Sequence, residues 1–72
     1  MNIVNRAIEW SQNTTGNPKV MLRVTMRSGK TETGQVIDCN NGVLILYLYP
    51  NERQRRHEFF AIDHIETVFP IV

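Results

Sequence analysis

The sequence predicts a mainly β fold, in which an N-terminal α-helix precedes five strongly bent antiparallel strands that form a small open barrel. Apolar residues recur at helical spacing near the N-terminus, and from Lys19 onward they alternate as they do in strands. Glycines and asparagines then interrupt the strand-like sequence at short intervals, as tight turns and bends require. The 72 residues predict a single small domain, residues 1–72.

The helix is predicted over residues 2–13. Its buried stripe has helical spacing and comprises Ile3, Val4, Ala7, Ile8 and Ser11. Asn2 is a suitable N-cap, and Gly16 and Pro18 end the element because glycine caps helices and proline cannot continue them. A helix this short is marginal alone, so we expect it to dock on the strands, with Trp10 as an anchor.

Two strands are predicted over residues 19–27 and 31–39, with a turn at Ser28-Gly29-Lys30 between them. The first strand alternates, and its apolar face carries Val20, Leu22, Val24 and Met26. Gly34 interrupts the second strand. Glycine inside a strand indicates a bend, a bulge or the close approach of another backbone.

Three further strands are predicted over residues 43–49, 56–62 and 65–69. Asn40-Asn41-Gly42, before the first of them, is typical of a hairpin because Asn and Gly accept positive φ angles. The strand 43–49 is apolar throughout, which indicates that both of its faces are covered. Asp63-His64 forms the tight turn before the last strand.

The predicted core is thin, because a domain of this size buries only about 60% of its unfolded surface. One cysteine, Cys39, excludes an internal disulfide, so oligomerisation is the stabilising device that remains. We expect the fourth and fifth strands to be apolar sheet edges that pair with another copy. The predicted interface residues are Phe59, Ala61, Ile65, Val68 and Phe69. Such head-to-tail pairing closes into a ring when the rotation permits, here of roughly five to seven copies.

Composition argues against several functional classes. A net charge of +1 is not that of a strongly basic nucleic-acid binder. We see no signal peptide and no run near the roughly 20 apolar residues that span a bilayer, so we expect a cytoplasmic protein without a membrane partner. Metal-ligand spacing is missing, and no cofactor site is indicated. Cys39 with His57 or His64 lacks an orienting group and an oxyanion site, so we expect no enzymatic activity.

The order and spacing of these elements resemble the Sm-like (LSm) family, most closely its bacterial Hfq-type branch. The first family motif is a glycine, a hydrophobic residue two positions later, an aromatic–acid pair and a hydrophobic block. Here Gly34-Gln35-Val36 opens the motif, Cys39-Asn40 stands at the pair, and Val43-Leu44-Ile45-Leu46 forms the block. The ending Ile65-Glu66-Thr67-Val68-Phe69-Pro70 is similar to that of the second motif. The agreement extends over nearly the whole chain.

The resemblance implies an SH3-like open barrel, a homo-oligomeric ring and RNA binding in an RNA-chaperone-like role. This sequence departs from the family where the family contacts RNA. Asn40, Asn41 and Gly42 replace an acid, a glutamine and a phenylalanine, while Ile62 and Asp63 replace a lysine and a histidine. We therefore expect RNA binding that is weak or of altered specificity. The alternative is a ring scaffold that binds a protein and has lost RNA binding.

The candidate RNA-binding residues are Lys19, Asn40, Asn41, Arg53, Arg55 and Arg56. The two asparagines either offer their amides to base edges or serve only the hairpin turn. The three arginines either contact phosphates, with Tyr47, Tyr49 or His57 available to stack a base, or form a solvated loop partly neutralised by Glu52 and Glu58. Lys19 is the remainder of the family's arginine-rich rim.

A second basic group consists of Arg23, Arg27 and Lys30. We favour an ion pair between an arginine of this group and Glu32 on the neighbouring strand over RNA contact. We likewise interpret His64 as a residue that caps its turn, with RNA contact as the alternative.

Overall fold

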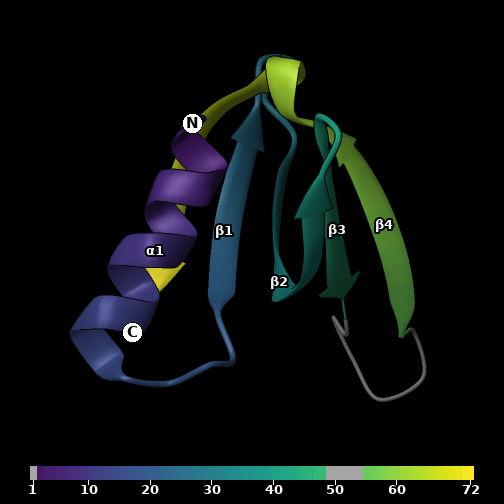
Figure 1. The fold of residues 1–72 in the computed structure, drawn as a ribbon. Helices are drawn as coiled ribbons and strands as arrows, with labels where there is room; N and C mark the ends of the chain where they lie inside the picture. Colours follow the sequence, from purple (N-terminus) through teal and green to yellow (C-terminus); the bar gives the residue numbers. More distant parts are fainter. Residues whose placement is uncertain (1, 49–54) are drawn as a thin grey trace.

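The computed structural model describes residues 2–48 and 55–72, which form one helix and a single antiparallel sheet (Figure 1). Its elements are α1 (Ile3–Thr15), β1 (Met21–Met26), β2 (Thr31–Asn40), β3 (Val43–Leu48), β4 (Arg56–Ala61), the 3-10 turn η1 (Ile62–His64) and β5 (Ile65–Ile71). The strand order is β4-β3-β2-β1-β5. The predicted helix and five antiparallel strands are therefore confirmed.

Both ends of α1 are capped as the sequence predicts. The Asn2 side chain accepts a hydrogen bond from the backbone N–H of Asn5 at 2.8 Å. Gly16 adopts a φ of 70° and its N–H donates to the carbonyl of Gln12 at 2.9 Å. The helix continues to Thr15, beyond the predicted end, and the Thr15 hydroxyl donates to the carbonyl of Ser11 at 2.9 Å.

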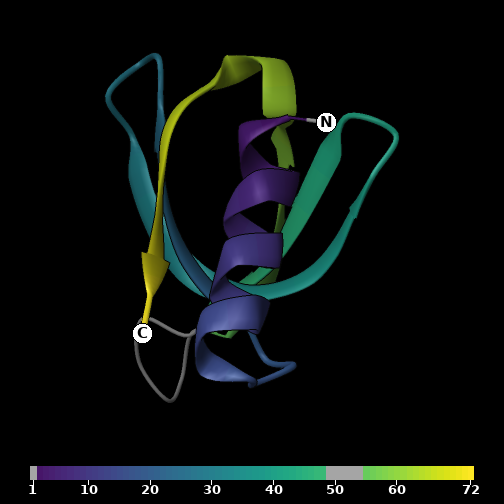
Figure 2. The ribbon, with the colours of Figure 1, turned by 60° about the vertical axis from the view of Figure 1, so that its left-hand side comes forward.

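The helix α1 lies across the open side of the curved sheet (Figure 2). Val4 is completely buried there and belongs to the hydrophobic core. On the same side, the Cys39 thiol of β2 donates a hydrogen bond to the Asn5 side chain at 3.0 Å. The helix therefore docks on the strands as expected, although Trp10 remains 44% exposed and anchors it only in part.

The strand β2 owes its position to Gly34 and to a bulge further along. A Cβ atom on Gly34 would lie 2.6 Å from Cδ2 of Leu48 and 2.7 Å from the carbonyl oxygen of Tyr47, so β3 approaches here more closely than a side chain allows. The β2–β3 register shifts between Val36 and Asp38. Bulges bend the strand that carries them, and Figure 2 shows β2 curving from one arm of the sheet into the other.

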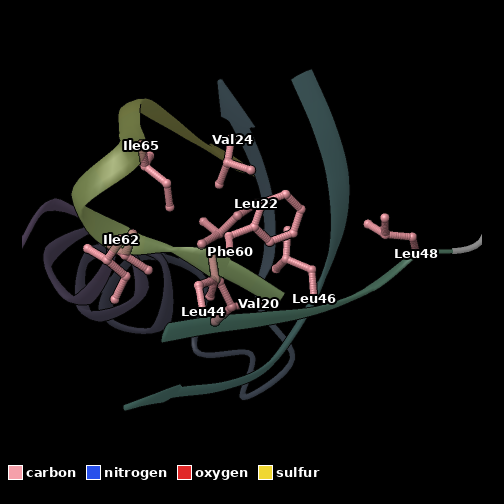
Figure 3. Packing of buried hydrophobic residues seen from close by; sticks show 10 residues of the cluster. Val20, Leu22, Val24, Leu44, Leu46, Leu48, Phe60, Ile62 and Ile65 are labelled. Atoms are coloured by element: carbon pink, nitrogen blue, oxygen red, sulfur yellow. The ribbon is translucent and has the colours of Figure 1, made fainter. Parts of the chain in front are cut away.

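The core fills the concave side of the sheet (Figure 3). Alternate residues of β1 and β3 point into it, and it also receives side chains from β4, η1 and β5. Its buried members are Val4, Val20, Leu22, Val24, Leu44, Leu46, Leu48, Phe60, Ile62 and Ile65. The apolar face predicted for the first strand is therefore confirmed, with Met26 partly buried at its end.

Ion pairs join β4 to the start of β2, although β3 lies between these strands in the sheet. Lys30 Nζ lies 2.8 Å from Glu58 Oε1, and Arg56 Nη2 lies 3.9 Å from Glu32 Oε1 and 4.0 Å from Glu58 Oε2. These contacts place side chains of β4 beside Lys30 and Glu32, at and just before the start of β2. The expected pairing of Glu32 with an arginine of the second basic group is wrong, because β4 presents Arg56 to it instead.

The last strand, β5, is longer than predicted and pairs with β1. It continues through Pro70, which lies opposite Leu22, and ends at Ile71. On the outer face of this pair, the guanidinium of Arg23 lies 5.8 Å from the centre of the Phe69 ring, and its Nε donates to the Thr33 hydroxyl at 3.4 Å. The side chains of β1 and β5 therefore contact each other on the convex side as well.

Candidate functional site

The two sheet edges, β4 and β5, are the strands that the sequence predicts there. Phe59 on β4 is 67% exposed and Phe69 on β5 is 61% exposed. Phe60 and Val68, the neighbours of these residues, contribute to the core, so both exposed rings point to the convex side because successive strand residues alternate. Each edge therefore carries one large apolar side chain on the same face of the sheet.

The other predicted interface residues are placed differently. Ala61 is exposed at the end of β4. Val68 is partly buried against the core, and Ile65 is only 5% exposed. Ile65 follows η1, and its side chain turns inward at the first position of β5. The exposed apolar surface of the edges is thus supplied by Phe59, Ala61 and Phe69, while Ile65 serves the core.

The hairpin between β2 and β3 has the geometry that its asparagines predict. Asn41 and Gly42 have φ angles of 52° and 77°. The Asn40 side-chain oxygen accepts a hydrogen bond from the backbone N–H of Asn41 at 3.0 Å, and the Gly42 carbonyl accepts one from the N–H of Ile62 at 2.9 Å. Asn40 therefore stabilises the turn, and the exposed Asn41 side chain offers its amide to solvent or a ligand.

The basic candidate residues within the described segments lie at the other end of the molecule. Figure 1 shows that β1 and β4 begin at the end opposite the β2–β3 turn. Lys19 precedes β1 and Arg55 precedes β4, and both are exposed. Arg56 is exposed but lies beside Glu32 and Glu58, and Arg53 lies outside the described residues. The structure therefore separates Lys19, Arg55 and Arg56 from the asparagine turn.

An aromatic pair lies at the start of β4. Tyr47 of β3 and His57 of β4 are opposite each other in the sheet, with ring centres 4.9 Å apart and planes tilted by 42°. Flat rings next to cationic side chains are the elements with which proteins bind single-stranded nucleic acid. Arg55 precedes this pair in the chain, whereas Arg56 points to the opposite face of β4, the face of Glu58 and Phe60.

A pocket of about 420 Å³ opens at the opposite end, between the β1–β2 turn and η1. We call it the turn pocket, and its lining residues are Met26, Arg27, Ser28, Lys30, Phe60 and His64. The N–H of Arg27 donates to the carbonyl of His64 at 2.9 Å and joins the two segments. The backbone carbonyl of His64 therefore contributes to the contact between the β1–β2 turn and η1. The sequence does not predict this pocket, because no local pattern indicates a contact between the β1–β2 turn and η1, which lie far apart in the chain.

The Cys39 thiol is partly buried and hydrogen-bonded. Burial, aided by the negative charge of Asp38, raises the pKa of Cys39 above its ordinary value. Because the thiolate is the reactive form, the thiol reacts slowly with electrophiles near neutral pH.

We expect iodoacetamide to modify Cys39 more slowly at pH 8 than it modifies the urea-unfolded chain. The raised pKa also means that the Cys39 thiol loses its proton at a higher pH in the folded state than in the unfolded state. The contribution of Cys39 to the free energy of unfolding is therefore fully present below the ordinary thiol pKa. It is lost as the pH rises above that value and through the raised pKa of the folded state. Equal alkylation rates for the folded and unfolded chains would contradict this prediction.

No helix within the described segments has the length and apolar character needed to cross a membrane. Over those same segments, His, Cys, Asp and Glu side chains do not gather into a group able to hold a metal ion. Comparison with known proteins finds no matching family model, no similar curated protein and no similar solved structure.

Proposed function

We propose that this chain is an Sm-like protein of the Hfq type, with an SH3-like open barrel, that assembles into a homo-oligomeric ring and binds RNA without catalysing a reaction. The observation that carries the proposal is the strand order, which leaves β4 and β5 as the two edges. Unpaired backbone groups and an exposed phenylalanine on each edge favour pairing with another copy. The reducing cytoplasm, where a lone thiol persists, is the compartment that we propose for it.

The ring follows from head-to-tail pairing of β4 with β5 of the next copy. Such pairing continues the sheet from one subunit to the next. Phe59 and Phe69 then lie on one face of the continued sheet, where aromatic side chains on neighbouring strands contact each other and lose their exposure to water. The two edges are different surfaces of the chain, so the contact is heterologous and generates a closed ring when the rotation allows.

Light scattering tests the assembly. We expect the wild type to have a mass several times 8.4 kDa and Phe59→Asp to approach that single-chain mass, because the aspartate places a charge in the edge contact. Ile37→Asp is the matched control, since Ile37 is 50% exposed but belongs to the interior strand β2. A single-chain mass for the wild type would contradict the proposed ring. An unchanged mass for Phe59→Asp would contradict the proposed contact between β4 and β5.

RNA binding is supported by the exposed arginines, the Tyr47–His57 pair and the turn pocket. Phosphate contacts dominate such binding, so the affinity should fall steeply with salt. The test compares short uridine-rich and adenine-rich RNAs on the wild type and on an Arg53/Arg55/Arg56→Ala triple variant. Failure of the wild type to bind either RNA at low salt would contradict the function, while full affinity in the triple variant would exclude these arginines.

A second candidate function is a ring scaffold that binds a protein. It is favoured by an apolar groove of about 390 Å³ along α1, lined by Ile3, Arg6, Ala7, Trp10 and Pro70. Aromatic side chains such as Trp10 are enriched in protein interfaces. This function predicts a protein that stays bound to the purified ring after nuclease treatment and is lost in Trp10→Ala. Loss of the bound protein with nuclease would favour RNA instead.

A further inference from the structure

We propose that the turn pocket binds a phosphate group of single-stranded RNA, with Arg27 and His64 as its contacting side chains. This inference rests on the proposed function and assigns to it a single site formed by residues that lie far apart in the sequence. Each subunit would carry one such pocket, at the end of the molecule where the β1–β2 turn meets η1.

The walls of the pocket are fixed by backbone hydrogen bonds. The N–H of Met26 donates to the carbonyl of Lys30 at 2.8 Å, and the N–H of Gly29 donates to the carbonyl of Met26 at 2.9 Å. The Arg27–His64 bond then joins this closed turn to η1. A preformed site loses little freedom when its ligand binds, so these bonds favour binding.

The charge in the pocket is predominantly positive. Lys30 extends over the Phe60 ring, 6.0 Å from its centre, but its ammonium group is already paired with Glu58. The Arg27 guanidinium forms no ion pair with any carboxylate in the part of the chain that the structure describes. A cation without a partner beside a concave surface attracts an anion, and a guanidinium fits two phosphate oxygens at once.

A second hollow, of about 550 Å³, adjoins the turn pocket at Arg27 and His64. It is lined by Asn2, Ile3, Arg27, Ile62, Asp63, His64 and Ile65. The start of α1 lies there, where the helix dipole is positive, whereas Asp63 adds a negative charge. The carboxylate of Asp63 disfavours an anion in this second hollow, which leaves room for the chain to continue past the two shared side chains.

These features fit a nucleotide unit better than a bare anion. The phosphate oxygens would accept hydrogen bonds from Arg27, from the imidazole of His64 and from the Ser28 hydroxyl. The apolar wall of Met26 and Phe60 would contact the attached sugar or base. A volume of about 420 Å³ is within the usual range for small-ligand pockets, roughly 300–1,000 Å³.

The experiment measures binding of a short labelled single-stranded RNA to the full chain over a series of salt concentrations. The test variant is Arg27→Gln with His64→Gln, which keeps the backbone bond between the two positions. The matched control is Arg6→Gln, which removes the same positive charge from the exposed side of α1. Mass and thermal unfolding establish that both variants remain folded and assembled.

We expect the double variant to bind RNA about tenfold more weakly, and its salt dependence to decrease by about one phosphate contact. Arg6→Gln should stay within about twofold of the wild type. Equal affinity of the double variant and the control would overturn the turn pocket while RNA binding itself stands. No RNA binding by the wild type would remove the proposed function.

AMP and inorganic phosphate distinguish the source of the phosphate. The RNA proposal expects both to compete only weakly, since they lack the rest of the chain. If AMP binds the wild type as tightly as the RNA does and the double variant loses it, the pocket is a mononucleotide site and the RNA assignment is overturned.

Discussion

Gly34→Ala should lower the free energy of unfolding by about 3 kcal/mol, because the added methyl group has no space. It would lie 2.6 Å from Cδ2 of Leu48 and 2.7 Å from the carbonyl oxygen of Tyr47. A leucine methyl group can rotate away, but a backbone carbonyl within the β2–β3 pair cannot move without breaking the sheet. The loss is therefore a steric effect of strand approach, to be measured by urea unfolding at a fixed protein concentration.

Gly16→Ala is the control for this measurement. Gly16 has a φ of 70° and open space around the position of a Cβ atom. Alanine there suffers only the left-handed backbone conformation, which costs about 1 kcal/mol. The difference between the two variants isolates the steric contribution at Gly34. Equal losses would contradict the close approach of β3.

Leu46→Ala should cost about 3 kcal/mol, as expected for a large core side chain replaced by a small one. Leu46 is completely buried in the middle of β3. Its loss leaves a cavity among side chains contributed by several strands (Figure 3). The surrounding strands are hydrogen-bonded to one another, so they cannot move inward to fill this cavity.

Ile45→Ala is the matched comparison, since it deletes a side chain of the same size from the other face of β3. Ile45 is only partly buried, so we expect a loss of about 1 kcal/mol. Urea unfolding and the temperature of thermal unfolding both measure the difference. Similar losses for the two variants would show that the convex face of β3 is as tightly packed as the core.

Much of the fold was predictable because it is encoded locally. The alternation of Val20, Leu22 and Val24 specifies the buried face of β1, and the caps of α1 lie next to the residues that they serve. The sequence marks Gly34 as a special position, but a bend, a bulge and a close approach of two strands all have the same sequence signal. The bulge itself falls at Ile37, where the sequence contains no glycine to mark it.

The candidate site was less predictable because its geometry depends on contacts between distant segments. The sequence leaves both phosphate contact and a solvated loop open for Arg56, and the curl of β2 brings Glu32 next to it. Arg27 and His64 lie far apart in the sequence, and only the folded backbone places them at one pocket. The sequence predicts that Ile65 lies in the edge interface, whereas the path of the chain through η1 directs its side chain into the core.

Pro70 limits how a neighbouring strand can dock on β5. Proline occurs within a strand only where its nitrogen faces away from the hydrogen-bonded partner, and here that partner is β1. The free side of β5 therefore lacks a donor at this position. A docking strand therefore loses one backbone hydrogen bond at Pro70. This loss disfavours alignments that place a backbone acceptor opposite Pro70, and it weakens the continuous ladder that fibrous aggregation requires.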